Sequence, residues 1–262
     1  MKTRLLFLLP FFVSLFSVDG QILKVDKGYL GIDSSNYFTG MFDIAFALND
    51  RGSTAEEDVV YIGLQNKTDL IYLAEKSATI LKTGINYFKI GEGPFVFNGS
   101  VHLREVFNRK NRFSPEVYGQ AQFDGSRNLD LRALLGGGFR WNVTHPVNTV
   151  YLGMGFFNEY EKWDNGEVVE NKNLLKLNTY LGVGHEFNNR ISISAISYFQ
   201  SGYDKDIEKL RNRVFASLQL ANDVTDKLRL KFTFNYEHDD RPVIPLNRHV
   251  FESYVGFEYK FK

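Results

Sequence analysis

The chain of 262 residues contains no cysteine and only 6 prolines. The lack of cysteine excludes disulfide bonds, cysteine-ligated zinc and thiol catalysis. Basic and acidic residues are equal in number, 31 Lys+Arg against 31 Asp+Glu, so the basic excess typical of nucleic-acid-binding proteins is missing. Beyond residue 20, no apolar run reaches the roughly 18 residues that a membrane-spanning helix needs, so any membrane insertion there must use strands.

The first residues have the pattern of a secretory signal peptide. Lys2 and Arg4 form a short basic start, and residues 5–16 are a mostly apolar run of signal-peptide length. A buried N-terminal helix is the alternative, which Pro10 in the middle of the run disfavours. We therefore expect three parts: a cleaved signal peptide at 1–20, a short periplasmic segment at 21–35 and the folded body at 36–262.

Aromatic residues are abundant in a chain that is polar overall. They make up 15% of the residues, with 24 Phe and 14 Tyr, while the mean hydropathy is only −0.25. Aromatic side chains favour strands and membrane interfaces. A bundle of membrane helices would be far more apolar, so the composition favours an all-β fold.

Apolar and polar residues alternate along most of the chain, which is the pattern of strands with two different faces. In the last segment one face carries Phe251, Ser253, Val255, Phe257, Tyr259 and Phe261, and the other carries Glu252, Tyr254, Gly256, Glu258 and Lys260. Twelve segments are predicted as strands: 38–48, 57–72, 77–90, 97–109, 114–125, 129–142, 147–161, 175–187, 190–203, 211–222, 228–237 and 251–261. Many are longer than the usual soluble strand of about 5–6 residues and reach the roughly 9–11 that a tilted membrane strand needs.

The connections between these segments alternate in length. The even-numbered ones are short: 74–76, 110–113, 144–146, 188–189 and 223–226. The odd-numbered ones are expected to be longer: 50–56, 91–96, 162–172, 204–210 and 240–248, with 125–128 as the exception. One rim of short turns and one rim of longer polar loops is typical of an outer-membrane barrel with both chain ends in the periplasm.

These patterns predict an all-β fold, a closed up-and-down antiparallel transmembrane β-barrel of about 12 strands. Alternation alone does not decide which face points inward, because a soluble sandwich buries its apolar face and a membrane barrel turns that face to lipid. The long charged groups on the polar faces favour the membrane solution. The aromatic ending Phe257, Tyr259 and Phe261 also resembles the signal that the outer-membrane assembly machinery reads, although Lys262 follows it. A soluble sandwich that binds a ligand inside is the alternative.

Charged side chains of both signs fall on the polar faces and are predicted to line the lumen. They are Asp130, Arg132, Arg140, Lys176, Glu186, Arg229, Lys231, Glu237, Glu252, Glu258 and Lys260. Such residues suit either the lining of a small-solute pore or a salt-bridged plug that holds a narrow barrel shut. Neither sign dominates, so no preference for anions or cations is predicted.

An enzyme is the competing hypothesis, because membrane barrels can hold a Ser-His pair on neighbouring strands. The candidate serines are Ser192, Ser194, Ser197 and Ser217, and the histidines are His102, His145, His185, His238 and His249. No serine lies in a GxSxG motif and no histidine in HExxH. The glycine runs at 136–138 and 182–184 are not phosphate loops, since no helix follows either. We expect no catalytic residues, no cofactor and no metal site.

The order of several motifs resembles the DUF481 family. The stretches that carry the likeness are 39–43, 101–104, 118–124, 129–138, 151–155, 159–161 and 236–242. Together they cover nearly all of residues 36–261. These are salt-stress-induced outer-membrane proteins of unknown molecular function, so the resemblance implies an outer-membrane barrel and supplies no catalytic residues.

The sequence therefore predicts a non-enzymatic protein of the bacterial outer membrane, either a narrow small-solute channel or an envelope-stability protein. A membrane-embedded phospholipase or lipid deacylase is the alternative. The expected partners are outer-membrane lipids and the barrel-assembly machinery, with no nucleic acid and with any solute unknown.

Overall fold

The computed structural model describes residues 36–51, 59–90, 93–144, 148–164, 166–188 and 190–261. The predicted signal peptide at 1–20 and periplasmic segment at 21–35 lie outside the described residues. Within those ranges, no helix has the length and apolar character needed to cross a membrane.

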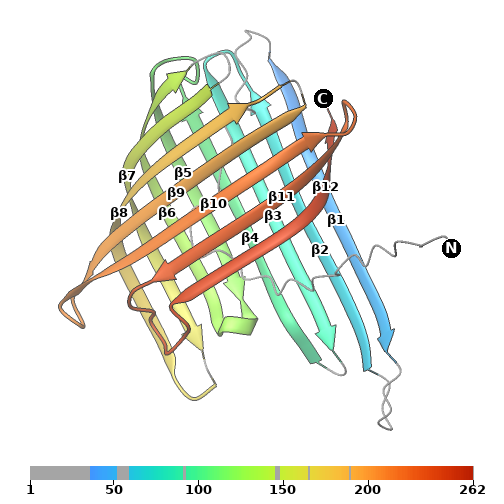
Figure 1. Cartoon of the computed structure of the whole chain (residues 1–262). Helices are drawn as coiled ribbons and strands as arrows, with labels where there is room; N and C mark the ends of the chain where they lie inside the picture. Colours follow the sequence, from blue (N-terminus) through green and yellow to red (C-terminus); the bar gives the residue numbers. More distant parts are fainter. Residues whose placement is uncertain are drawn as a thin grey trace, which may run out of the picture.

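Antiparallel strands make up nearly the whole described chain (Figure 1), so the predicted all-β antiparallel fold is confirmed. The strands are β1 (Tyr37–Arg51), β2 (Val59–Leu73), β3 (Ser77–Ile90), β4 (Gly93–Phe107), β5 (Phe113–Asp124), β6 (Leu129–Thr144), β7 (Asn148–Asp164), β8 (Val169–Glu186), β9 (Ile191–Asp204), β10 (Lys209–Asp223), β11 (Leu228–Asp239) and β12 (His249–Phe261). A 3-10 turn, η2 (Gly125–Arg127), joins β5 to β6. Each strand pairs with the next in sequence, and β1 also pairs with β12 through the residue pairs Gly40–Phe261, Met41–Lys260 and Phe42–Tyr259, so the strand order forms a closed ring.

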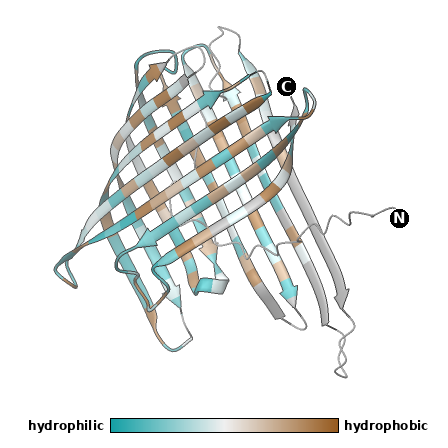
Figure 2. Ribbon diagram, viewed as in Figure 1, coloured by the Kyte–Doolittle hydropathy of each residue, from teal (hydrophilic) through white to brown (hydrophobic). Residues whose placement is uncertain are grey.

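The apolar face of the sheet points outward and the charged face points inward. Along the strands in Figure 2, hydrophobic and hydrophilic residues alternate, as a sheet with two different surroundings requires. Leu131, Phe232 and Phe257 are exposed on the outside, whereas Arg132 and Glu258 are almost completely buried. A soluble sandwich would show the reverse arrangement, so this structure excludes an apolar core enclosed by a polar outer surface.

One irregularity moves a residue from the face expected for it. The β6–β7 register shifts between Leu129 and Leu131, which leaves Asp130 as the extra residue of a bulge. Leu129 therefore turns inward, where it is buried, and Asp130 turns outward, where it pairs with Lys162 on β7 at 2.8 Å. The sequence pattern predicted an inward position for Asp130, because strict alternation does not foresee an inserted residue.

The two rims of the sheet differ less in loop length than expected. We call the rim where β1 begins and β12 ends the terminal end, and the opposite rim, which holds η2 and residues 240–248, the loop end. The expected long connections at 162–172 and 204–210 are short, because β7 and β8 stay paired up to Asp164–Val169 and β9 and β10 stay paired up to Asp204–Lys209. Strand pairing thus continues into residues that their polarity had assigned to loops, and 240–248 is the long connection in the described part of the loop end.

Candidate functional site: the charged interior

Inward-facing polar residues from β4 to β10 fill the centre of the molecule. Alternate residues of each strand point inward, so neighbouring strands bring charged and aromatic groups into layers. Two groups carry most of the charge. We call the first the tyrosine layer (Arg104, Glu116, Tyr118, Arg140, Tyr151, Tyr180 and Tyr198) and the second the ion-pair cluster (Arg132, Glu159, Glu161, Lys176, Arg213, Glu237 and Asp239).

In the tyrosine layer, two arginines share one carboxylate. Arg104 Nη1 donates to Glu116 Oε2 at 3.3 Å, and Arg140 Nη2 donates to the same oxygen at 3.1 Å. The Tyr180 hydroxyl donates to Glu116 Oε1 at 2.6 Å and accepts from Arg140 Nε at 3.1 Å. Both guanidinium groups also lie over tyrosine rings, Arg104 over Tyr118 at 5.0 Å and Arg140 over the rings of β7 and β8. Arg104 and Arg140 are each only 1% exposed, so the layer excludes water at this level.

Two tyrosine rings of this layer lie over glycines on the neighbouring strand. Tyr151 of β7 is opposite Gly182 of β8, and Tyr180 of β8 is opposite Gly153 of β7. A Cβ atom built on either glycine would collide with the facing ring. The glycines therefore give the rings room to lie flat along the sheet, which places the Tyr180 hydroxyl on Glu116.

The ion-pair cluster lies nearer the loop end, since Arg132 is close to the loop-end start of β6 and Arg140 is close to its terminal end. Glu159 is its centre: it accepts from Arg132 Nε at 2.5 Å and forms ion pairs with Lys176 and with Arg213 Nη1, the latter at 3.5 Å. Arg213 also reaches Glu161 at 3.3 Å and the carboxylates at the loop end of β11. Since these charges are buried, each depends on its partners for stabilisation.

An apolar cap covers the interior at the loop end. Ile244, in the 240–248 connection, is buried against Leu129 and Trp163, and Val243 and Leu246 pack on the same cluster. The connection is held down by polar contacts to β10. They are Asp240 Oδ1 accepting from Asn212 N at 2.8 Å, Arg211 Nη1 donating to Arg241 O, and Arg241 Nη1 donating to Leu210 O.

An apolar group also faces inward at the terminal end, on the opposite side of the ring. It consists of Ile71, Leu73, Ala78, Ile80 and Val106, all at most 1% exposed, with Tyr37 packed on it. These residues lie at the terminal ends of β2, β3 and β4. The interior is thus lined by apolar contacts at both rims and, between them, by charges packed together with a central cluster of buried hydrophobic residues that includes Leu134, Phe157, Ile196 and Phe215.

The wall formed by β2, β3, β11 and β12 is more accessible to water than the rest. Lys82 and Asp69 form an ion pair with side-chain exposures of 15% and 16%. Arg229 binds Asp223 through Nε at 2.5 Å, and Lys231 binds Glu258 at 2.9 Å, and both basic side chains are partly exposed. Water therefore reaches inward-facing charges on this wall, which it does not at Arg104 or Arg140.

The structure places the sequence-predicted lining residues in four different settings. Arg132, Arg140, Lys176, Glu237 and Glu258 are buried inside, and Arg229 and Lys231 are inside but partly exposed. Asp130 is not a lining residue because of the bulge, and Glu186 is exposed because β8 ends there, at the terminal rim. The side chains of Glu252 and Lys260, and that of Phe261 in the proposed assembly signal, lie outside the described part, while Phe257 and Tyr259 are exposed outward.

Sequence reasoning missed five charged residues that organise the interior: Arg104, Glu116, Glu159, Glu161 and Arg213. Each lies in a predicted strand, at an inward position of the alternation. Assigning faces to 97–109, 114–125, 147–161 and 211–222 would have found them. What the sequence could not show is which of these charges meet across strands.

The histidines and serines considered for catalysis have varied surroundings. His102 is buried, its Nδ1 lies 3.0 Å from Gln120 Oε1, and its ring stacks on Tyr118. His238 stacks on His249, whose Nδ1 lies 2.9 Å from the Tyr236 hydroxyl, and His145 lies outside the described residues.

Of the serines, Ser197 is exposed outward, Ser192 and Ser194 are half-buried, and Ser217 is buried. Over the described ranges, no group of three or more His, Cys, Asp or Glu residues is placed to hold a metal. A lipid hydrolase remains a prediction, and assaying phospholipase and deacylase activity in mixed micelles tests it.

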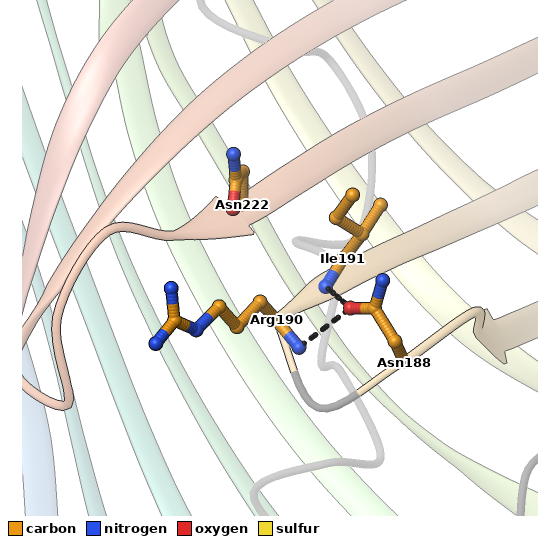
Figure 3. A pocket seen from close by; sticks show the side chains of 4 residues that line it. All are labelled: Asn188, Arg190, Ile191 and Asn222. Atoms are coloured by element: carbon orange, nitrogen blue, oxygen red, sulfur yellow. Dashed lines mark hydrogen bonds between the residues drawn. The ribbon is translucent and has the colours of Figure 1, made fainter.

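An open hollow at the terminal end is lined by Asn188, Arg190, Ile191 and Asn222 (Figure 3). Asn188 Oδ1 accepts from the backbone N–H groups of Arg190 at 2.8 Å and Ile191 at 2.7 Å, which fixes the β8–β9 turn. The backbone of Asp223 donates to Arg190 O at 2.7 Å. The hollow is explained by this turn chemistry, and its polar groups do not converge on a common point.

A closed antiparallel ring with apolar residues outside and buried charges inside defines the class of this protein as a β-barrel. The chain belongs to the family described as "Protein of unknown function, DUF481", whose model matches residues 64–261. The predicted family is therefore confirmed. No curated protein matches the chain.

Several solved structures show low similarity to the chain. The translocator domain of the autotransporter NalP from Neisseria meningitidis is 11% identical with a TM-score of 0.49, covering 90% of this chain and 92% of that one. A structure of the NanC porin is 12% identical with a TM-score of 0.45, covering 87% and 100%. The Pseudomonas putida toluene transporter TodX is 12% identical with a TM-score of 0.41, covering 86% and 80%. These identities and TM-scores are low, so no functional conclusion follows from them.

Proposed function

We propose that this protein is a non-enzymatic barrel of the bacterial outer membrane, with twelve strands closed at the β1–β12 seam and an interior sealed in its resting state. The observation that carries the proposal is the distribution of charge: large apolar side chains face outward while arginines and glutamates are buried inside. Only lipid gives such an exterior a favourable environment. The strands, 12 to 18 residues long, exceed the roughly 9–11 residues needed to cross.

Export and assembly follow from the same proposal. Residues 1–20 act as the signal peptide and 21–35 as a periplasmic segment, which puts the terminal end in the periplasm and the loop end outside. Phe257 and Tyr259 face outward on β12, where the assembly machinery can read them together with Phe261. Outer-membrane lipids then surround the apolar exterior.

Burial supports a sealed barrel over an open pore. The tyrosine layer is almost inaccessible to water, Asp239 is the one partly exposed member of the ion-pair cluster, and the apolar cap covers the loop end. A permeation path through β4–β10 would have to break these contacts. A stabilising role in the envelope needs no such path and fits the resting structure.

A narrow small-solute channel is the second candidate, and one observation favours it. The inward charges on the β2–β3 and β11–β12 wall are partly exposed to water. Any path would therefore run along this wall, past Lys82 and Lys231, and not through the centre.

Conductance in planar bilayers separates the two candidates. The sealed barrel gives no steady current, whereas the channel gives small unitary steps. If steps occur, Lys82→Gln and Lys231→Gln change their size or ion preference, and Lys162→Gln, on the outer surface, is the matched control. A large, permanent conductance of the unmodified protein would contradict the sealed interior.

The membrane assignment has a separate test. Refolded protein is expected to migrate differently in a gel before and after heating and to give a β-type circular dichroism spectrum in detergent. A soluble, folded monomer in the absence of detergent would rule out the proposal.

A further inference from the structure

Basic side chains gather at one place on the terminal end. The β2–β3 turn, residues 74–76, and the β4–β5 turn, residues 108–112, together hold one acidic residue, Glu75, and four basic ones, Lys76, Arg109, Lys110 and Arg112. The β10–β11 turn, residues 224–227, lies on the opposite side of the ring and holds one residue of each sign. The excess of positive charge is therefore confined to one part of this rim.

The two basic turns lie against each other. Arg109 joins them, because its backbone N–H donates to Lys76 O at 3.0 Å and its Nε donates to Ala74 O at 2.7 Å. Lys76, Lys110 and Arg112 are exposed around this buried arginine. Over the residues that the structure describes, none of these three side chains forms an ion pair. Their charges are thus available to a ligand from outside the chain.

Arg112 lies at the edge of the outward, apolar surface. Its guanidinium is 5.2 Å from the centre of the Trp141 ring, and its backbone oxygen accepts from Asn142 N at 2.7 Å, which fixes its position at the rim. The Trp141 ring stacks on Phe113 with centroids 6.4 Å apart. Phe113 and Phe139 are 61% and 64% exposed on the same face. A cation and an exposed aromatic surface therefore meet at one point.

This combination matches an anionic phospholipid. A phosphate at the rim accepts from guanidinium and ammonium groups, while the acyl chains of the same molecule extend along the aromatic surface. Inorganic phosphate would use the cations but not the aromatic rings. With Glu105, the outward carboxylate of β4 that accepts from Thr79 Oγ1 at 2.6 Å, the balance is still four basic to two acidic side chains, so the site attracts anions.

We propose that Lys76, Lys110, Arg112, Phe113 and Trp141, which we call the rim patch, bind an anionic phospholipid. The headgroup phosphate lies at Arg112 and Lys110, and the acyl chains pack on Phe113 and Trp141. The inference rests on the proposed function, since it requires the exterior to lie in a membrane, and it adds a preference for one class of lipid at one side of the barrel.

Quenching of tryptophan fluorescence by brominated lipids tests the proposal. The refolded barrel is placed in phosphatidylcholine vesicles that contain either phosphatidylglycerol or phosphatidylcholine with chains brominated near the headgroup. Trp141 faces outward, whereas Trp163 is 5% exposed inside the loop end and gives an unquenched background. A basic residue near an anionic membrane surface contributes roughly fivefold in affinity. Brominated phosphatidylglycerol should therefore quench Trp141 half-maximally at about one fifth, or less, of the mole fraction that brominated phosphatidylcholine requires.

The double variant Lys110→Gln and Arg112→Gln removes both headgroup contacts and should reduce this preference at least about fivefold. The matched control is Lys227→Gln, at the same rim on the opposite side of the ring, and it should keep the preference. Equal quenching of the unmodified protein by the two brominated lipids overturns the proposal. An unchanged preference in the double variant does so as well.

A salt titration of the unmodified protein makes the test independent of how the variants fold. Raising the sodium chloride concentration to about 0.5 M screens exposed charges and should weaken the preference for phosphatidylglycerol. A preference that does not change with salt would remove the basic residues from the explanation. Absence of quenching by either lipid would instead contradict the membrane placement of the exterior, so failure of the proposed function is distinguishable from failure of the lipid preference alone.

Discussion

Replacing a single outward-facing residue with arginine measures whether the exterior lies in lipid. On β7 the outward positions are Leu152, Met154 and Phe156, followed towards the loop end by Asn158. Met154 is 61% exposed in the structure, so in water an arginine there would find solvent and cost little. In a bilayer the same arginine lies in the apolar band, where Arg costs about 2–4 kcal/mol near the midplane. The folding equilibrium of Met154→Arg should therefore fall by roughly 30- to 1,000-fold.

The control is Asn158→Arg, which makes the same change on the same strand and face but beyond the apolar run. Near the interface the cost falls to about 0–1 kcal/mol. Both variants can be compared by urea unfolding from phospholipid vesicles, with the fluorescence of Trp141 and Trp163 as the signal. Equal stability of the two variants, or a larger loss in Asn158→Arg, would refute the placement of this face in lipid.

Three further predictions concern the interior and its packing. Glu159→Gln removes the shared partner of several buried cations and should lower the free energy of unfolding in urea by about 3–5 kcal/mol. Glu186→Gln, at an exposed strand end, is the control and should change this free energy by less than about 0.5 kcal/mol. Similar losses in the two variants would contradict the ion-pair cluster. Gly138→Ala puts a Cβ against the backbone of β7 and should lower the free energy of unfolding by about 1–3 kcal/mol. The Cβ of Gly256→Ala meets no atom within 4 Å, so this control variant should refold normally, as judged by heat modification on gels. Ile244→Asp should release the apolar cap and speed proteolysis of the 240–248 connection in the folded protein, and an unchanged rate of cleavage would show that the cap does not hold this connection down.

The sequence predicted the parts of the fold that follow from alternation. β11 and the described side chains of β12 have the faces expected from residues 228–237 and 251–261, because both sequences alternate regularly. The DUF481 resemblance, supported by motif order, was confirmed by the family model over residues 64–261. An alternation that repeats every two residues determines which side chains share a face, and this is sufficient to separate exterior from interior.

The sequence did not predict how the interior is connected. The bulge at Asp130 leaves no signal in a pattern of alternating residues, and it changed the side on which that residue lies. Polar loops at 162–172 and 204–210 were expected from composition, but strand pairing extends into both segments, to Asp164–Val169 and to Asp204–Lys209. The meeting of Arg104, Glu116 and Arg140 depends on the register of β4, β5 and β6, and register is a property of pairs of strands. Charged residues on one face were predictable, but their partners were not.

The reciprocal arrangement of rings and glycines on β7 and β8 has a consequence for how this family can vary. An L-residue at position 153 is compatible with the fold only if the ring at position 180 becomes smaller or leaves, and the same coupling links positions 151 and 182. Substitutions at these sites should therefore occur in pairs among related sequences, with the large and small residues exchanging strands. Since the hydroxyl at 180 also holds Glu116, such an exchange would alter the charge pairing three strands away and would favour further compensating changes there.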